Sequence, residues 1–170
     1  MPTIVDLSHV LADGTVTYPG LPGPVISDHL SRTASRERYA PGYEFQIGRI
    51  EMVGNTGTYV DSPYHRYPGG KDLSELPLSS LANLDCLVAR VPFEGDRPID
   101  RLPFTAGEVR GRAVVVHTGW DRHWRTPQYH EGHPYLTGEL AEWLVAAGAA
   151  LVGIDAFNID GVDTGERPVH

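Results

Sequence analysis

A short run of polar residues between positions 55 and 65 carries the groups best suited to chemistry. Asp61 offers a carboxylate and His65 an imidazole, and the two flank Pro63. A histidine with an ordinary pKa of about 6.5 can take up or release a proton near neutral pH. Carboxylate and imidazole groups also bind divalent metal ions. The run therefore predicts acid–base catalysis or metal binding, with a backbone-capping histidine and an Asx-turn aspartate as the structural alternatives.

The spacing of the run places three further side chains near this pair. Gly57 permits backbone angles that other residues resist, and Pro63 fixes its own φ and makes the residue before it extended. If the segment before Pro63 is a strand of period two, Asn55, Tyr59 and Asp61 lie on one face and could converge on one point. The sequence therefore predicts metal-site spacing with unusual ligands.

Asn55 and Tyr59 are weak candidates for binding zinc. An amide oxygen is a neutral ligand, and a phenol must first lose a proton with a pKa of about 10. These two oxygens favour a harder cation than zinc, or no metal at all. The alternative is that Asn55 and Tyr59 hydrogen-bond each other or a substrate.

The run resembles the signature of the cyclase family, which includes bacterial kynurenine formamidase and isatin hydrolase, and whose pattern is His-x-Gly-Thr-His-x-Asp-x-Pro-x-His. The matching residues are Gly57, Thr58, Asp61, Pro63 and His65. Asn55 and Tyr59 replace the family's two histidine ligands. Similarity continues, in the family's order, at Asp6-Leu-Ser-His9, Tyr18-Pro-Gly20, Leu76-Pro-Leu78, Thr118-Gly-Trp120 and Val152-Gly-Ile-Asp155. The resemblance therefore covers nearly the whole chain.

This resemblance implies an α/β protein with the swivelling β/β/α fold and hydrolysis of a small amide, cyclic amide or lactone, with arylformamidase as the best-known activity. In the family a divalent metal activates water, and a histidine at the position of His65 moves the proton. Asp61 matches a metal-binding carboxylate and His170 a second-site histidine, so manganese or zinc is the expected cofactor. In the family a metal-binding glutamate follows, so we expect this chain to lack the C-terminal section.

Substrate-pocket residues are expected from three places in the chain. Trp120 follows Thr118-Gly119 at the end of a predicted strand, where ligands often bind in α/β sheets. His9 and Tyr18 belong to the resembling motifs near the N-terminus. Aromatic and imidazole side chains between positions 117 and 133 could line a pocket for an aromatic ring, although loop or surface positions are expected for most of these histidines: His117, His123, His130 and His133.

Two other functions stay open beside a metal-dependent hydrolase. The loss of two histidine ligands fits a degenerate member that binds a small molecule without turning it over. His65 and Asp61 could also carry out acid–base chemistry without a metal. The chain has no Gly-x-Ser-x-Gly elbow and no P-loop spacing, which argues against a serine hydrolase or a nucleotide-binding protein.

Composition predicts one domain over residues 1–170, because 170 residues with 41% hydrophobic content can bury one core. A net charge of −8 argues against nucleic-acid binding. The lone cysteine, Cys86, is expected to be a buried thiol, and with no signal peptide or membrane-length apolar run we expect a cytoplasmic protein and no membrane partner. The expected partners are a small-molecule substrate and, from the family, further copies of the chain.

Frequent glycine and proline residues predict many turns and therefore short helices and strands. The expected strands are Thr3–Leu7, Phe45–Val53, Cys86–Val91, Ala113–His117 and Ala150–Ile154. One clear helix runs from an N-cap at Thr137 to Gly148, a second starts at Thr105 with Glu108 completing a capping box, and a third follows Pro77 through Leu81. The helix after Thr137, followed directly by a strand, predicts an α/β unit with Ala113–His117 as a parallel neighbour.

Overall fold

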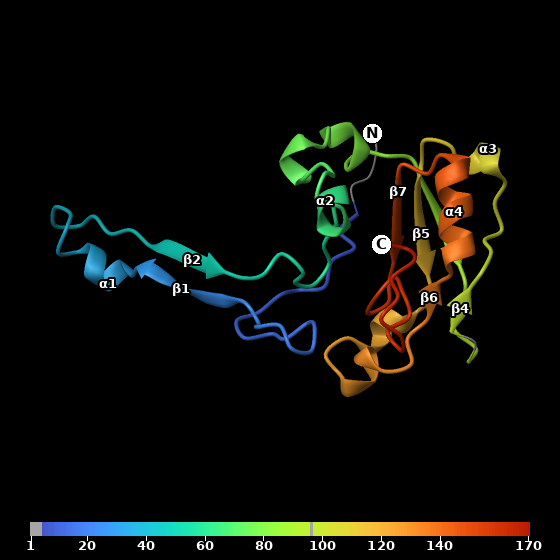
Figure 1. Ribbon diagram of the computed structural model, residues 1–170. Helices are drawn as coiled ribbons and strands as arrows, with labels where there is room; N and C mark the ends of the chain where they lie inside the picture. The colour runs from blue at the N-terminus through green and yellow to red at the C-terminus, as the bar shows by residue number, and fades with distance from the viewer. Residues whose placement is uncertain (1–4, 96) are drawn as a thin grey trace. The chain divides into compact units, whose positions relative to one another are not determined.

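The computed structural model describes residues 5–95 and 97–170 and divides the chain into two compact units, Met1–Val60 and Asp61–His170 (Figure 1). The described residues form few helices and both parallel and antiparallel sheets. The mixed α/β class expected from the sequence is therefore confirmed.

The first unit is built on an antiparallel hairpin. Strand β1 (Val25–Leu30) pairs with β2 (Ile47–Glu51), with an irregularity in register between Asp28 and Leu30. A one-turn helix, α1 (Arg32–Ser35), follows β1. The buried Ser35 hydroxyl donates to the Arg32 carbonyl and accepts from the Phe45 backbone N–H, which ties the turn to the segment leading into β2.

Two segments of this unit that were expected to be extended, Thr3–Leu7 and the segment before Pro63, form no strand within the described residues. Part of the Thr3–Leu7 strand lies outside the described residues, and residues 5–7 are irregular. Residues 54–58 form bends instead of the expected period-two strand. Gly57 has a φ of +68°, a left-handed conformation that breaks a strand, and the Thr56 hydroxyl donates to the Val53 carbonyl at 2.6 Å. Local turn bonds therefore replace strand pairing here.

The second unit centres on a three-stranded parallel sheet in the order β3-β5-β7. Its strands are β3 (Cys86–Arg90), β5 (Ala113–His117) and β7 (Leu151–Ile154). Both pairings run in simple register, with Val114 opposite Leu87 on one side and Val152 on the other. The parallel pairing expected between the strand at Ala113–His117 and the strand at Ala150–Ile154 is thus confirmed, and β3 pairs with β5 on its other side.

Helix α4 (Gly138–Ala147) lies along one face of this sheet (Figure 1). Thr137 caps its first turn by accepting from the Leu140 N–H, and Gly148 ends it with a φ of +81°. The helix buries Leu140, Leu144 and Ala147, which share one face. Their partners in one hydrophobic cluster are Ala89, Ile99, Val109, Val114, Val116 and Leu136. Burial of these side chains holds helix and sheet together.

Short elements complete the second unit. A small parallel sheet joins β4 (Pro98–Ile99) to β6 (Tyr135–Leu136). The remaining helical segments are α2 (Pro63–Arg66), α3 (Ala106–Val109) and four 3₁₀ turns at Leu73–Glu75, Leu78–Ser80, Trp120–His123 and Pro127–His130. The capping box of Thr105 and Glu108 is confirmed at α3, whereas the helix expected after Pro77 is only a 3₁₀ turn. No helix in the described part of the chain is long and apolar enough to cross a bilayer.

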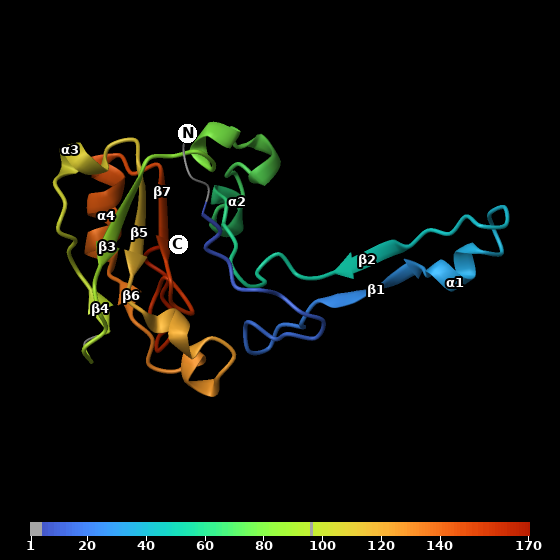
Figure 2. The ribbon, with the colours of Figure 1, turned by 180° about the vertical axis from the view of Figure 1, so that it is seen from behind.

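Cys86 is exposed, which corrects the expectation of a buried thiol. Strand β3 lies at an edge of the sheet (Figure 2), and along it Cys86, Val88 and Arg90 are exposed while Ala89 is buried. The apolar run at Cys86–Val91 is typical of a strand that is covered on both faces. Because β3 alternates on an edge instead, its first residue faces outward.

Candidate metal and acid–base site

Asp61 and His65 flank the start of α2 in the second unit. Ser62 is extended, with φ −84° and ψ 165°, and Pro63 occupies the first helical position. Proline fits there because its fixed φ suits a helix and its missing N–H costs no hydrogen bond. The proline therefore starts the single turn that brings the side chain at position 65 back toward position 61, a helical turn that the sequence did not predict.

The loop after α2 holds that turn in place. The Tyr64 N–H donates to the Lys71 carbonyl at 3.0 Å, and the Gly70 N–H donates to the Tyr67 carbonyl at 2.8 Å. A Cβ at Gly70 would lie 2.6 Å from the carbonyl carbon of Pro63, closer than any real contact. The glycine therefore allows the loop to pack directly on the backbone of the helix that carries His65.

His65 and Asp61 form an ion-pair contact, with Nδ1 3.4 Å from Oδ1. Both side chains keep solvent access, since their exposed fractions are 42% and 30%. A partly solvated imidazole beside a carboxylate can exchange protons with water and with a bound molecule. The structure thus brings together the two residues that the sequence singled out first.

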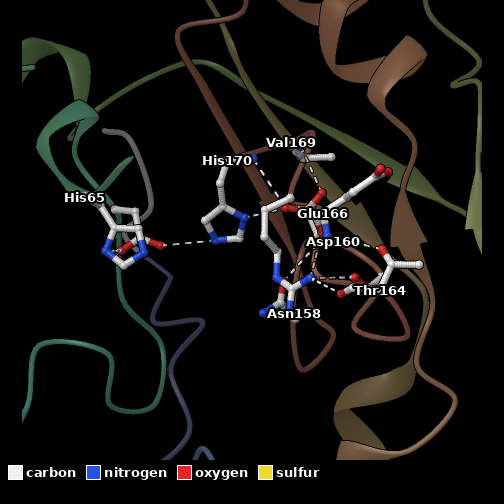
Figure 3. Close-up of polar contacts among 10 residues, drawn as sticks. His65, Asn158, Asp160, Thr164, Glu166, Val169 and His170 are labelled. Atoms are coloured by element: carbon white, nitrogen blue, oxygen red, sulfur yellow. Dashed lines mark hydrogen bonds and ion pairs between the residues drawn. The ribbon is translucent and has the colours of Figure 1, made fainter. Parts of the chain in front are cut away.

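His170 joins this pair from the other end of the second unit (Figure 3). Its Nε2 lies 3.9 Å from Oδ2 of Asp61, and its ring centre lies 5.8 Å from that of His65. Only 16% of the His170 side chain is exposed. Three predicted site residues therefore meet in one place, although more than a hundred positions separate the first from the last.

Asp160 holds His170 from the opposite side, and the sequence analysis missed it. Its carboxylate is fully buried, accepts from the Val169 N–H at 2.9 Å and the His170 N–H at 3.3 Å, and lies 2.5 Å from Nδ1 of His170. A buried carboxylate needs such partners to offset its lost hydration. The signal in the sequence is slight, since Asn158-Ile159-Asp160 suggests only a turn. In the structure the Asn158 side chain accepts from the Asp160 N–H.

The donor set of this cluster fits a divalent metal ion. One ligand atom each from Asp61, His65 and His170 lies within 4.8 Å of the others. Ligands bound at about 2.0–2.2 Å in tetrahedral geometry sit roughly 3.3–3.6 Å apart, so small side-chain movements would suffice to close the site. Two imidazoles and a carboxylate suit zinc and manganese among the common ions.

Asn55 and Tyr59, the other two predicted ligands, belong to the first unit, and their metal role stays a prediction. Asn55 is partly buried and Tyr59 is exposed. The turn between them is fixed by the Gly57 N–H, which donates to the Thr17 hydroxyl at 3.0 Å. A Cβ at Gly57 would meet the Leu11 side chain at 2.7 Å, so this position needs glycine for space as well as for its positive φ.

The predicted pocket residues occupy different environments. His9 and Tyr18 are partly buried in the first unit. Trp120, in the second unit, is 2% exposed, and its indole N–H donates to the Tyr129 carbonyl at 3.0 Å. The Trp120 ring packs edge-on against Phe93. Its substrate contact stays a prediction, as do those of His9 and Tyr18.

Asp155 anchors the turn that leads into Trp120. One oxygen accepts from the Thr118 N–H and hydroxyl, and the other accepts from the Gly119 N–H at 2.7 Å. His117 Nε2 lies 3.9 Å from the same carboxylate, and Arg90 contacts His117 Nδ1. These bonds give Asp155 a structural role in joining the ends of β5 and β7, although His117, Asp121 and Asp155 also lie within metal-ligand reach of one another.

Two histidines near this turn are more enclosed than expected. His133 is fully buried, not a surface histidine, because the rings of Tyr135 and Phe157 pack around it. Burial lowers the pKa of His133, and burial also lowers the pKa of His130. Among the described residues, His133 Nε2 and His130 Nδ1 are buried without a hydrogen-bond partner. Both rings are therefore stabilised in the neutral form.

A family model described as "Putative cyclase" matches residues 5–161. The chain belongs to this family. Among curated relatives, kynurenine formamidase of Bacillus cereus is 23% identical over 168 residues, which cover 98% of this chain and 74% of the relative. Kynurenine formamidase of Geobacillus thermodenitrificans is 27% identical over 169 residues, with the same two coverages. The cyclase-family resemblance expected from the sequence is confirmed.

Solved structures of the cyclase type share the fold. One described as a potential metal-dependent hydrolase with cyclase activity superposes with a TM-score of 0.71 at 21% identity, over 97% of this chain and 73% of the other. A second, described as a predicted metal-dependent hydrolase from Bacillus stearothermophilus, gives 0.65 at 22% identity, over 98% and 74%. At such low identities the likeness establishes the cyclase-family fold.

Proposed function

We propose that this cyclase-family chain is a metal-dependent hydrolase of a small amide, cyclic amide or lactone, with arylformamidase-like activity. The observation that carries the proposal is the convergence of Asp61, His65 and His170 within metal-ligand reach. The family and the kynurenine formamidase relatives support hydrolysis of a carbon–nitrogen bond.

In this proposal Asp61 and His170 hold the ion, and the place of Asn55 and Tyr59 in the family motif makes them candidate further ligands from the sequence alone. A bound manganese or zinc ion would supply a water of lowered pKa and a Lewis acid for the substrate carbonyl. His65 Nδ1 faces Asp61, so we assign proton transfer to Nε2. The imidazole takes a proton from the attacking water and returns it to the leaving nitrogen or oxygen as the bond to the carbonyl carbon breaks.

The same geometry also permits His65 to be a ligand instead of a base. Its ring nitrogen lies close enough to Asp61 and His170 to share one ion with them. The two roles differ in what His65→Ala does to metal binding. A base can be removed with the metal retained, whereas loss of one of three protein ligands weakens binding by orders of magnitude.

A second candidate function is a small-molecule binder without turnover. It is favoured by Asn55 and Tyr59, which replace two imidazole ligands with weaker oxygen donors. A binder built on hydrogen bonds needs no stoichiometric metal. Metal content and turnover therefore separate the two functions directly, and turnover that survives a chelator would instead support metal-free chemistry by His65 and Asp61.

The deciding experiment is elemental analysis of protein purified without a metal-affinity tag, followed by titration with manganese and zinc. The hydrolase requires at least one ion per chain and its loss in Asp61→Ala, with turnover of formamides, cyclic amides or lactones. Asp100→Ala, which removes an exposed carboxylate of the same unit, is the matched control and should keep the metal. If wild-type protein binds no ion at any concentration, the metal mechanism is wrong.

We also propose that the chain forms a homo-oligomer through the β1–β2 hairpin. An isolated two-stranded hairpin is marginally stable in water, and this one exposes apolar side chains on both strands, among them Val25, Ile26, Ile47 and Ile50. Clustered exposed apolar groups are typical of protein contacts. A second copy of the chain is the partner that the family suggests.

A further inference from the structure

His170 is held between two carboxylates that touch different ring nitrogens. Nδ1 lies 2.5 Å from the buried Asp160, and Nε2 faces Asp61 at 3.9 Å (Figure 3). We propose that Asp160 is a positioning residue that fixes His170 as the Nδ1–H tautomer and directs the Nε2 lone pair toward Asp61 and His65. This inference rests on the proposed metal site but concerns a residue outside the ligand set.

The tautomer follows from what Asp160 can accept. Oδ1 takes the Val169 N–H, and Oδ2 takes the His170 N–H together with Nδ1. With both oxygens acting as acceptors, the proton of the third bond belongs to the imidazole. A neutral imidazole carries one proton, so Nε2 is left with its lone pair, the form in which histidine binds a metal.

The orientation follows from how firmly Asp160 itself is held. The carboxylate is fully buried, and Asn158 accepts from its backbone N–H at 2.9 Å. The loop after it is tied by Arg167, whose Nη1 donates to the carbonyls of Gly161, Thr164 and Glu166. Because both backbone and side chain of Asp160 are fixed, His170 cannot rotate without breaking a buried charged hydrogen bond.

Loss of this contact should weaken the site without removing any ligand. Partners that orient a metal-binding histidine typically contribute about 10- to 100-fold in metal affinity. Asp160→Asn keeps the shape but offers an amide whose NH₂ group can donate to Nδ1. That donation would place the proton on Nε2, the nitrogen needed for the metal.

The first test is ¹⁵N NMR of histidine-labelled, metal-free protein in mildly alkaline buffer. Wild-type His170 should show a protonated Nδ1 and an unprotonated Nε2. Asp160→Asn should shift His170 toward the Nε2–H form. Asp163→Asn is the matched control, since Asp163 lies in the same loop but pairs with Arg97 at 2.6 Å and should leave the tautomer unchanged. A protonated Nε2 in the wild type overturns the inference even if the variants fail to fold.

The second test is manganese and zinc affinity, measured by titrating the same metal-free proteins. Asp160→Asn should bind 10- to 100-fold more weakly than wild type, and Asp163→Asn should match wild type. In a His170→Ala background, Asp160→Asn should cause no further loss, because its effect passes through the imidazole. A further loss there would overturn the positioning role. Wild-type protein that binds no metal but has the Nδ1–H tautomer would overturn the proposed function alone.

Discussion

His65 Nδ1 lies 3.4 Å from Oδ1 of Asp61, one helical turn away across Pro63. Because a single proline-initiated turn sets this distance, the pair depends on local backbone geometry more than on the surrounding core. The third member of the cluster, His170, depends instead on a buried contact at the far end of the unit. The two halves of the candidate site can therefore be disturbed separately.

His65→Ala should lower the turnover rate by roughly 10²- to 10⁴-fold, because it removes the group proposed to carry the proton. Steady-state kinetics on a formamide substrate and metal analysis of the same preparation measure the effect. Retained metal with lost turnover fits the base. Loss of the metal would make His65 a ligand, and unchanged turnover would contradict both roles.

Gly70→Ala should destabilise the second unit by about 1–3 kcal/mol, because the new Cβ would meet the Pro63 backbone at 2.6 Å. The movement of α2 should also lower turnover, because α2 carries His65 and starts next to Asp61. Gly69→Ala is the neighbouring control, since a Cβ there meets nothing within 4 Å. Urea unfolding measures the stability of both variants, and equal values for the two would show that the close approach is unimportant.

Stability should fall as the pH drops below about 6.5, the ordinary pKa of histidine. Burial lowers the folded-state pKa of His133 and His130, so the unfolded chain binds protons that the folded chain resists. This contribution is fully present above the unfolded pKa and is lost as the pH falls toward the folded one. Urea unfolding at several pH values measures it.

The double variant His130→Gln and His133→Gln should flatten this pH dependence between neutral and mildly acidic buffer. His29→Gln, which removes an exposed imidazole of the first unit, controls for a general effect of losing histidine. If wild type and the double variant lose stability in parallel as the pH falls, the buried imidazoles are not its cause.

The hairpin contact is tested by the pair Ile26→Lys and Ile50→Glu. These residues face each other in the β1–β2 register, so opposite charges keep a favourable cross-strand pair while the apolar surface is removed. Light scattering after gel filtration should show a smaller assembly than wild type. Val145→Lys changes a highly exposed apolar residue of α4 and should leave the mass unchanged. A monomeric wild-type protein would contradict the proposed oligomer.

Local sequence signals determined the strands of the three-stranded sheet and two of the helices of the second unit. Thr137 and Gly148 bound α4 as predicted, and Thr105 with Glu108 starts α3, because capping bonds join residues three or four positions apart. The apolar β-branched run at Ala113–His117 also formed the expected central strand. The sequence also identified Asp61 and His65 as neighbouring site residues on either side of Pro63, because only four positions separate them.

Long-range packing decided what the sequence left open. Strand β1 was not predicted, because its residues become a strand only by pairing with β2. The apolar run around Cys86 predicts a buried thiol, because no local signal shows that β3 forms the edge of its sheet. Asp160 was missed because its value lies in a carboxylate buried against His170, ten positions away. The sequence by itself determined which chemical groups are present, and the tertiary structure decided which of them meet, because burial and pairing depend on contacts that the local pattern does not encode.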